Sequence, residues 1–265
     1  KTQKLQNGKP TILEADLEKY LNKNLKANNL RFTFNLADLK KADVFYFTFD
    51  TPLIEKDEVD ISLLFKAASD LSKIIKNNSL VIISSQVPVG TTEKLGSVID
   101  LNGKKNIEIA YIPENLQLGK AMQRFFQPAM IVIGTEKISI YKNICSIYDK
   151  VLTPKIHVNV KTAEMVKHAI NAYLATSISF ANELANLSDK VGADFLEVAK
   201  ILKLDERIGP FARVNPGLGF AGGTLARDLK IIKKLGREYQ VSTDMTDAVL
   251  AVNEKQKVWV VEFLN

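Results

Sequence analysis

Residues 79–101 read SLVIISSQVPVGTTEKLGSVIDL: a β-rich apolar run, a turn with proline and glycine, and a segment of helical periodicity. Three more short apolar runs in the first half of the chain read as strands, at residues 42–49, 107–112 and 129–135. Further helical patterns lie at residues 11–29, where leucines recur at every fourth position from Leu13 to Leu25, and at residues 60–78 and 136–151. Strands that are apolar on both faces and alternate with helices are typical of a parallel sheet covered on both sides. We therefore expect an α/β domain with a doubly wound parallel sheet.

The pattern changes near residues 151–160. A long helix is predicted from Thr162 to about Val191, because this segment holds no proline or glycine. From Ala169 to Asn182 it carries no charge, so it should be covered on most sides, by its own domain and by a second subunit. Further helical patterns lie at residues 193–203, 225–239 and 246–264. The sequence thus predicts two domains, 1–154 and an all-helical 155–265, and a dimer through the long helix.

Composition excludes several classes of protein. The chain has 265 residues, 46% hydrophobic and 25% charged, a normal balance for a globular protein. Its net charge of +6 comes from dispersed lysines, which favours a solvated surface over a nucleic-acid site, although attraction for anionic ligands remains open. One cysteine and two histidines without metal-ligand spacing give no basis for a disulfide or a metal site. With no apolar signal or membrane segment, a soluble cytoplasmic protein without membrane partners is expected.

A glycine-rich stretch, NPGLGFAGGTLARD at residues 215–228, contains G-x-G-x-x-G at Gly217, Gly219 and Gly222. A dinucleotide fingerprint needs a strand before the first glycine and an acid about 20 residues further on, and this stretch has neither. Two interpretations remain: a tight turn between helices, or a loop whose backbone approaches a ligand closely. Arg227 and Asp228 at the start of the next helix favour the ligand site, because a carboxylate there can orient a water or a hydroxyl.

A second candidate group lies on the long helix. Lys167 and Asn171 are four residues apart and therefore share a face. Lys167 begins the uncharged stretch, where a partly desolvated ammonium suits proton transfer or the stabilisation of an oxyanion. The alternative is a structural lysine at the edge of that stretch, paired with Glu164.

Four motifs follow one another over nearly the whole chain: VPVGTT, PENLQLG, AEMVKHAINAYLATSISFANELANL and RIGPFARVNPGLGFAGGTLARD. In this order they resemble the UDP-glucose/GDP-mannose dehydrogenase family. The resemblance implies a Rossmann-like NAD-binding domain, a central helical dimerisation domain and a C-terminal nucleotide-sugar domain. Members of the family oxidise the C6 alcohol of the sugar twice, to a carboxylate.

The resemblance also implies roles for individual residues. Those expected to contact NAD are Thr51, Pro52, Ser85, Gln86 and Val87. Five residues are expected to be catalytic. Glu114 works with a water, and Lys167 and Asn171 stabilise the oxyanion and hold the sugar. Asp228 orders the catalytic water, and Thr224 occupies the nucleophile position. Those expected to bind substrate are Gly219, Gly222, Arg227 and Arg207, the last reaching the substrate of a neighbouring subunit.

The sequence departs from the family pattern at several positions. Thr224 stands where the family has a cysteine, and Leu225 and Ala226 replace the phenylalanine and proline beside it. Leu118 replaces a second glutamate, and Gln86 replaces a threonine. The chain begins at a point that resembles the family just after its second strand and stops where the central domain ends. On this basis we expect a partial doubly wound sheet, without the first βαβ arm and its glycine fingerprint, and we expect this chain alone to bind NAD weakly or not at all.

The cysteine position bears on the reaction. A thiol with a pKa near ~8.5 is partly ionised at neutral pH, whereas an alcohol needs an adjacent base to become a nucleophile. No histidine is expected to activate Thr224, because His168 follows Lys167 and points ~100° away around the helix. The resemblance, with this departure at Thr224, therefore implies an NAD-dependent oxidation of a nucleotide sugar by one hydride transfer. The alternative is a non-catalytic homologue that serves as a dimeric scaffold or binds a sugar nucleotide.

Overall fold

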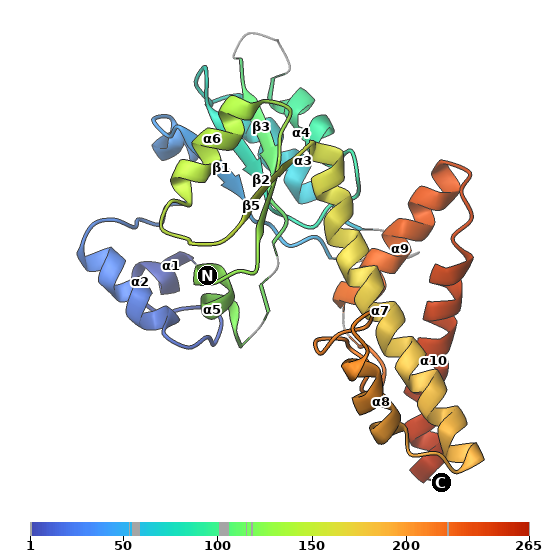
Figure 1. The fold of residues 1–265 in the computed structure, drawn as a ribbon. Coiled ribbons are helices and arrows are strands. Elements are labelled where there is room, and N and C mark those ends of the chain that lie inside the picture. Colours follow the sequence, from blue (N-terminus) through green and yellow to red (C-terminus); the bar gives the residue numbers. More distant parts are fainter. Residues whose placement is uncertain are drawn as a thin grey trace. The chain divides into compact units, whose positions relative to one another are not determined.

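The computed structural model describes residues 2–52, 54, 59–100, 106–114, 116–117, 119–221 and 223–264. By internal contacts the chain forms two compact units, Lys1–Thr51 with Ile61–Lys167, and Pro52–Asp60 with His168–Asn265. Figure 1 shows the fold with its elements labelled. Among the described helices, none is long and apolar enough to cross a lipid bilayer.

The first unit is built on a five-stranded sheet of order β1-β2-β3-β4-β5. The strands are β1 (Val44–Phe47), β2 (Leu80–Ile83), β3 (Glu108–Tyr111), β4 (Ile131–Gly134) and β5 (Lys155–Val158). The pairs β1–β2, β2–β3 and β4–β5 are parallel. The α/β class with a mainly parallel sheet, predicted from the apolar runs, is therefore confirmed.

Helices cover both faces of this sheet (Figure 1). The helices of the unit are α1 (Thr2–Gln6), α2 (Leu17–Lys26), the 3₁₀ helix η1 (Leu36–Leu39), α3 (Ser62–Ser72), α4 (Thr91–Ile99), α5 (Ala121–Phe126) and α6 (Ile138–Ile147). On β2, Val81 and Ile83 pack with α3, α4 and the start of α7, whereas Leu80 and Ile82 pack with α6 on the other face. All four residues of β2 and of β4 are buried, which explains why these two strands lack the polar alternation of a half-exposed sheet, whereas β1 exposes Val44 and Tyr46 on one face.

Three details differ from the prediction. The helix expected over residues 11–29 begins only at Leu17, because Asp16 has a left-handed backbone (φ 61°) and Leu13 is 99% exposed. Strand β5 was not predicted, since Lys155 and His157 interrupt its apolar pattern. The contact of β4 with β3 is antiparallel. In its described residues the connection between β3 and β4 has one helix, the short α5, which buries no residue, whereas a parallel return needs a crossover packed on the sheet.

The second unit is helical in its described residues. It contains most of α7 (Val160–Val191), with α8 (Phe195–Leu204), α9 (Gly223–Glu238) and α10 (Asp244–Leu264). One core cluster joins Ala175 of α7 to Phe220, Leu229 and Val249, and a second joins α7 to α8. The predicted long helix is confirmed and starts two residues earlier than expected. Residues 155–158, which the predicted second domain included, form β5, and the domain division itself stays a prediction.

Candidate active site

Two turns at the carboxyl ends of neighbouring parallel strands lie against each other. Thr51 follows β1, and its Oγ1 donates a hydrogen bond to the carbonyl oxygen of Gln86, which follows β2, at 2.6 Å. Thr51 and Val87 are buried, with 1% and 0% of their surfaces exposed, and Pro52 is exposed. Four of the five expected cofactor residues, Thr51, Ser85, Gln86 and Val87, therefore lie in these two turns of the first unit. In α/β proteins, ligands bind at this edge of the parallel sheet.

Ser85 in the second of these turns has an unusual environment. It is 3% exposed, and its carbonyl oxygen accepts a hydrogen bond from the Tyr111 hydroxyl at 3.3 Å. Its own Oγ has no hydrogen-bond partner within the described part of the chain. A buried hydroxyl without a partner is costly, and a bound ligand with a polar group would remove that cost.

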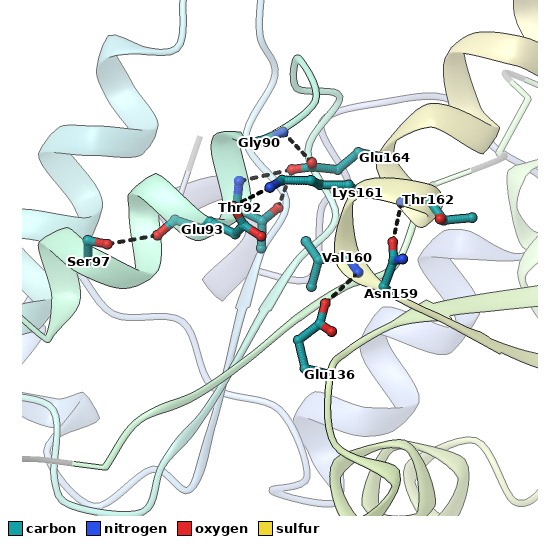
Figure 2. A network of polar contacts seen from close by, with 10 residues as sticks. All are labelled: Gly90, Thr92, Glu93, Ser97, Glu136, Asn159, Val160, Lys161, Thr162 and Glu164. Carbon is teal, nitrogen blue, oxygen red and sulfur yellow. Dashed lines mark hydrogen bonds and ion pairs between the residues drawn. The ribbon is translucent and has the colours of Figure 1, made fainter.

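The turn after Val87 is fixed by Glu164 of α7, as Figure 2 shows. The Glu164 carboxylate is fully buried and accepts hydrogen bonds from the backbone N–H of Gly90 (2.5 Å), the backbone N–H of Thr92 (2.9 Å) and the Thr92 hydroxyl (2.7 Å). Backbone N–H groups in the first turn of a helix lack partners within the helix, and a negative charge there is favourable. A carboxylate of the protein itself therefore occupies the N-terminus of α4. No sequence pattern pointed to this contact.

Lys167, one turn further along α7, approaches Glu114 in the first unit. Its Nζ donates a hydrogen bond to the carbonyl oxygen of Glu114, and only 7% of its surface is exposed. The Glu114 side chain is exposed and accepts a hydrogen bond from the backbone N–H of Leu116. The structure thus brings together two of the expected catalytic residues. Leu118, at the second glutamate position, lies outside the described residues.

Asp228 is the centre of a buried polar cluster in the second unit. It lies on α9 with none of its surface exposed. The Nδ2 of Asn171 donates a hydrogen bond to its Oδ2, and the Nδ1 of His168 lies 2.6 Å from its Oδ1. His168 is also fully buried. Asn171 and Asp228, each expected to be catalytic, are therefore in direct contact, whereas the contact of His168 was not foreseen.

The other expected residues of α9 lie around its first turns. Thr224 is exposed and precedes Asp228 by four residues, so the two share a helix face. Arg227 is half-buried, and Gly222 lies outside the described residues. Leu225 and Ala226, which replace the family phenylalanine and proline, pack against the core cluster around Phe220 and Leu229.

The glycine stretch is held by side-chain amides from α7 and α10. The Oδ1 of Asn182 accepts a hydrogen bond from the Gly217 N–H at 2.7 Å, and the Nε2 of Gln256 donates one to the Gly217 carbonyl at 2.8 Å. Asn253 accepts from the Phe220 N–H at 2.8 Å and donates to the Phe220 carbonyl at 3.0 Å. We call these three side chains the amide clamp. Residues 205–221 before α9 contain no strand, so the stretch lacks the setting of a dinucleotide fingerprint.

Arg207 forms an ion pair within its own loop. Its Nε and Nη2 donate hydrogen bonds to the two carboxylate oxygens of Asp205, at 2.9 and 2.7 Å. These hydrogen bonds hold the pKa of Asp205 below its usual range. The guanidinium is exposed, and the structure does not bring it into contact with Asp228, Asn171 or any other expected site residue that it describes.

Residues 1–152 match the NAD binding domain of the UDP-glucose/GDP-mannose dehydrogenase family, and residues 161–255 match its central domain. The UDP-glucose 6-dehydrogenase TuaD of Bacillus subtilis is 30% identical over 267 residues, which cover 100% of this chain and 58% of that protein. The structure of a UDP-glucose dehydrogenase from Pyrobaculum islandicum superimposes with a TM-score of 0.89 and 31% identity, covering 96% of this chain and 60% of that one. A UDP-D-ManNAc dehydrogenase from Pyrococcus horikoshii gives a TM-score of 0.89 at 25% identity, covering 99% and 62%. The chain therefore spans about three fifths of the length of these relatives.

Proposed function

Because this chain belongs to the UDP-glucose/GDP-mannose dehydrogenase family, we propose that it oxidises an alcohol carbon of a UDP- or GDP-sugar with NAD, in the cytoplasm. The observation that carries the proposal is the buried Asp228 carboxylate, bound by Asn171 of the long helix. An ionised carboxylate in such a place is stable only with hydrogen-bond donors, and it is well suited to ordering a water that receives a proton.

The turns after β1 and β2 fit a cofactor. Ser85 offers a buried hydroxyl that has no hydrogen-bond partner among the described residues, and Thr51 and Gln86 fix the two turns against each other. Thr51, Pro52, Ser85, Gln86 and Val87 would hold NAD in this proposal. NAD, when bound, supplies the acceptor for the hydride that leaves the alcohol carbon.

The protein side chains would manage the charge and the proton at the alcohol oxygen. Lys167 is buried and directed by the Glu114 carbonyl, so its ammonium can donate to the substrate oxygen and stabilise the negative charge that develops there. The hydroxyl proton would pass to a water ordered by Asp228, and Glu114 would work with a water near the substrate. Asn171 fixes Oδ2 of Asp228 and holds the sugar. Backbone at Gly219 and Gly222, with Arg227 and the Arg207 of a neighbouring subunit, completes substrate binding.

The proposed reaction stops after one hydride transfer. A second transfer from an aldehyde requires a covalent adduct with a nucleophile, and Thr224 offers an exposed hydroxyl in place of a thiol. The product would then be a carbonyl compound.

The dimeric scaffold is the second candidate function, and an exposed apolar stripe on α7 favours it. Five residues form this stripe and are between 43% and 70% exposed: Met165, Tyr173, Phe180, Leu187 and Val191.

Turnover distinguishes the two functions. The full-length protein is incubated with NAD and with UDP- or GDP-sugars, and NADH is followed by its absorbance. We expect NADH formation with one class of sugar nucleotide, and Asp228→Asn should lower kcat by about 100-fold or more because the water loses its acceptor. Asp247→Asn is the matched control, since Asp247 is a partly exposed acid of the same unit that pairs with Lys233. A folded dimer that forms no NADH with any sugar nucleotide would support the scaffold.

A further inference from the structure

The second carboxylate oxygen of Asp228 is held by a residue to which the proposed reaction gives no role. His168 and Asp228 both have 0% of their surfaces exposed, and the Nδ1 of His168 lies 2.6 Å from Oδ1. Asn171 binds the other oxygen. Each oxygen of this buried carboxylate therefore has a side-chain neighbour from α7.

His168 and Asn171 approach the Asp228 carboxylate together. His168 and Asn171 are three residues apart on α7, so they share a helix face and approach Asp228 from the same side. An ionised carboxylate only accepts hydrogen bonds, so the imidazole nitrogen that faces it must carry a proton. Two donors on two oxygens fix both the position and the plane of the carboxylate.

We propose that His168 is a positioning residue for Asp228. Its Nδ1–H donates to Oδ1, and together with Asn171 it holds the carboxylate in the one orientation that orders the proton-accepting water. This inference rests on the proposed function for its catalytic consequence. The bond between His168 and Asp228 does not depend on that function and can be measured in the resting protein.

The chain contains an internal control for the tautomer of His168, because it has two histidines. The Nε2 of His157 lies 2.9 Å from the carbonyl oxygen of Thr135, an atom that can only accept. Nitrogen-15 NMR correlation spectra of the imidazole rings should therefore show His157 protonated at Nε2 and His168 protonated at Nδ1. In Asp228→Asn the Nδ1 resonance of His168 should shift while that of His157 stays in place. The proposal would be overturned if His168 lacked a proton on Nδ1, or if its Nδ1 resonance did not change in Asp228→Asn.

Kinetics test the positioning role. His168→Leu keeps the volume but removes the donor, and we expect kcat to fall by about 10- to 100-fold with KM changed by less than about three-fold, because a misplaced acceptor affects the chemical step. His168→Asn, which keeps an amide donor near the Nδ1 position, should recover part of this loss. His157→Asn is the control and should leave kcat unchanged. Thermal melts establish that each variant is folded.

The outcomes separate the two proposals. If His168→Leu is folded and retains kcat within about two-fold, the histidine only fills space and the inference fails. If the unmodified protein forms no NADH, the proposed function fails, and the NMR measurement still decides whether His168 holds Asp228. If His168→Leu does not fold, His168→Asn and the response of His168 to Asp228→Asn decide the same question.

Discussion

At the scale of single residues, Glu164 provides a test of how the first unit is held together. Its buried carboxylate accepts three hydrogen bonds from Gly90 and Thr92. Glu164→Gln turns one acceptor oxygen into a donor that faces a backbone N–H. We expect the free energy of unfolding to fall by about 1–3 kcal/mol, measured by urea denaturation.

Glu93 is the matched control for this substitution. It belongs to the same network (Figure 2), but its carboxylate is half exposed and pairs with Lys161 at 3.1 Å. Glu93→Gln should change the free energy of unfolding by less than about 1 kcal/mol, because exposed ion pairs contribute little. Equal losses in the two variants would show that burial of Glu164 does not matter.

At the scale of elements, the glycine stretch is a preformed loop. Gly219 has φ +77°, and a Cβ added there would lie 2.8 Å from Oδ1 of Asn253 in the amide clamp. Gly219→Ala should therefore lower the free energy of unfolding by about 1–3 kcal/mol, measured by denaturant melts. Gly217→Ala is the control, since its Cβ would meet nothing within 4 Å and its φ is not positive. A Gly219→Ala protein as stable as the control would remove the idea of a rigid loop.

The sequence predicted secondary structure best where a strand or helix has a clear apolar pattern within its own residues. Apolar runs such as residues 80–83 and the uninterrupted helix after Val160 are local signals, and the elements they predicted are present. Contacts between distant segments leave no local signal. The hydrogen bonds of Glu164 with the first turn of α4 and the contact of His168 with Asp228 could therefore not be predicted from residue spacing. Direction around the helix separates His168 from Lys167, but it could not show that α9 places Asp228 beside the histidine.

At the scale of the whole molecule, we propose that the apolar stripe on α7 forms a homodimer. Tyr173, Phe180 and Leu187 recur every seven residues on α7 and are 68%, 49% and 57% exposed. Such a stripe is typical of a helix that packs against another copy. Sedimentation velocity should show a dimer at micromolar concentration, and Phe180→Glu should shift it to monomer. Leu152→Glu, at a residue of the first unit that is 95% exposed, is the control and should leave the dimer intact. A monomeric unmodified protein would contradict the proposal.

We propose that the full-length protein oxidises a nucleotide sugar once, with Thr224 unable to provide the covalent adduct for a second transfer. The most direct measurement is the number of NADH molecules formed per nucleotide sugar consumed at completion, with a carbonyl-trapping reagent present. We predict about one NADH and a trapped carbonyl product, and a ratio that moves towards two in Thr224→Cys, where a thiolate can add to the aldehyde. A ratio near two in the unmodified protein, with a carboxylate product, would contradict the claim.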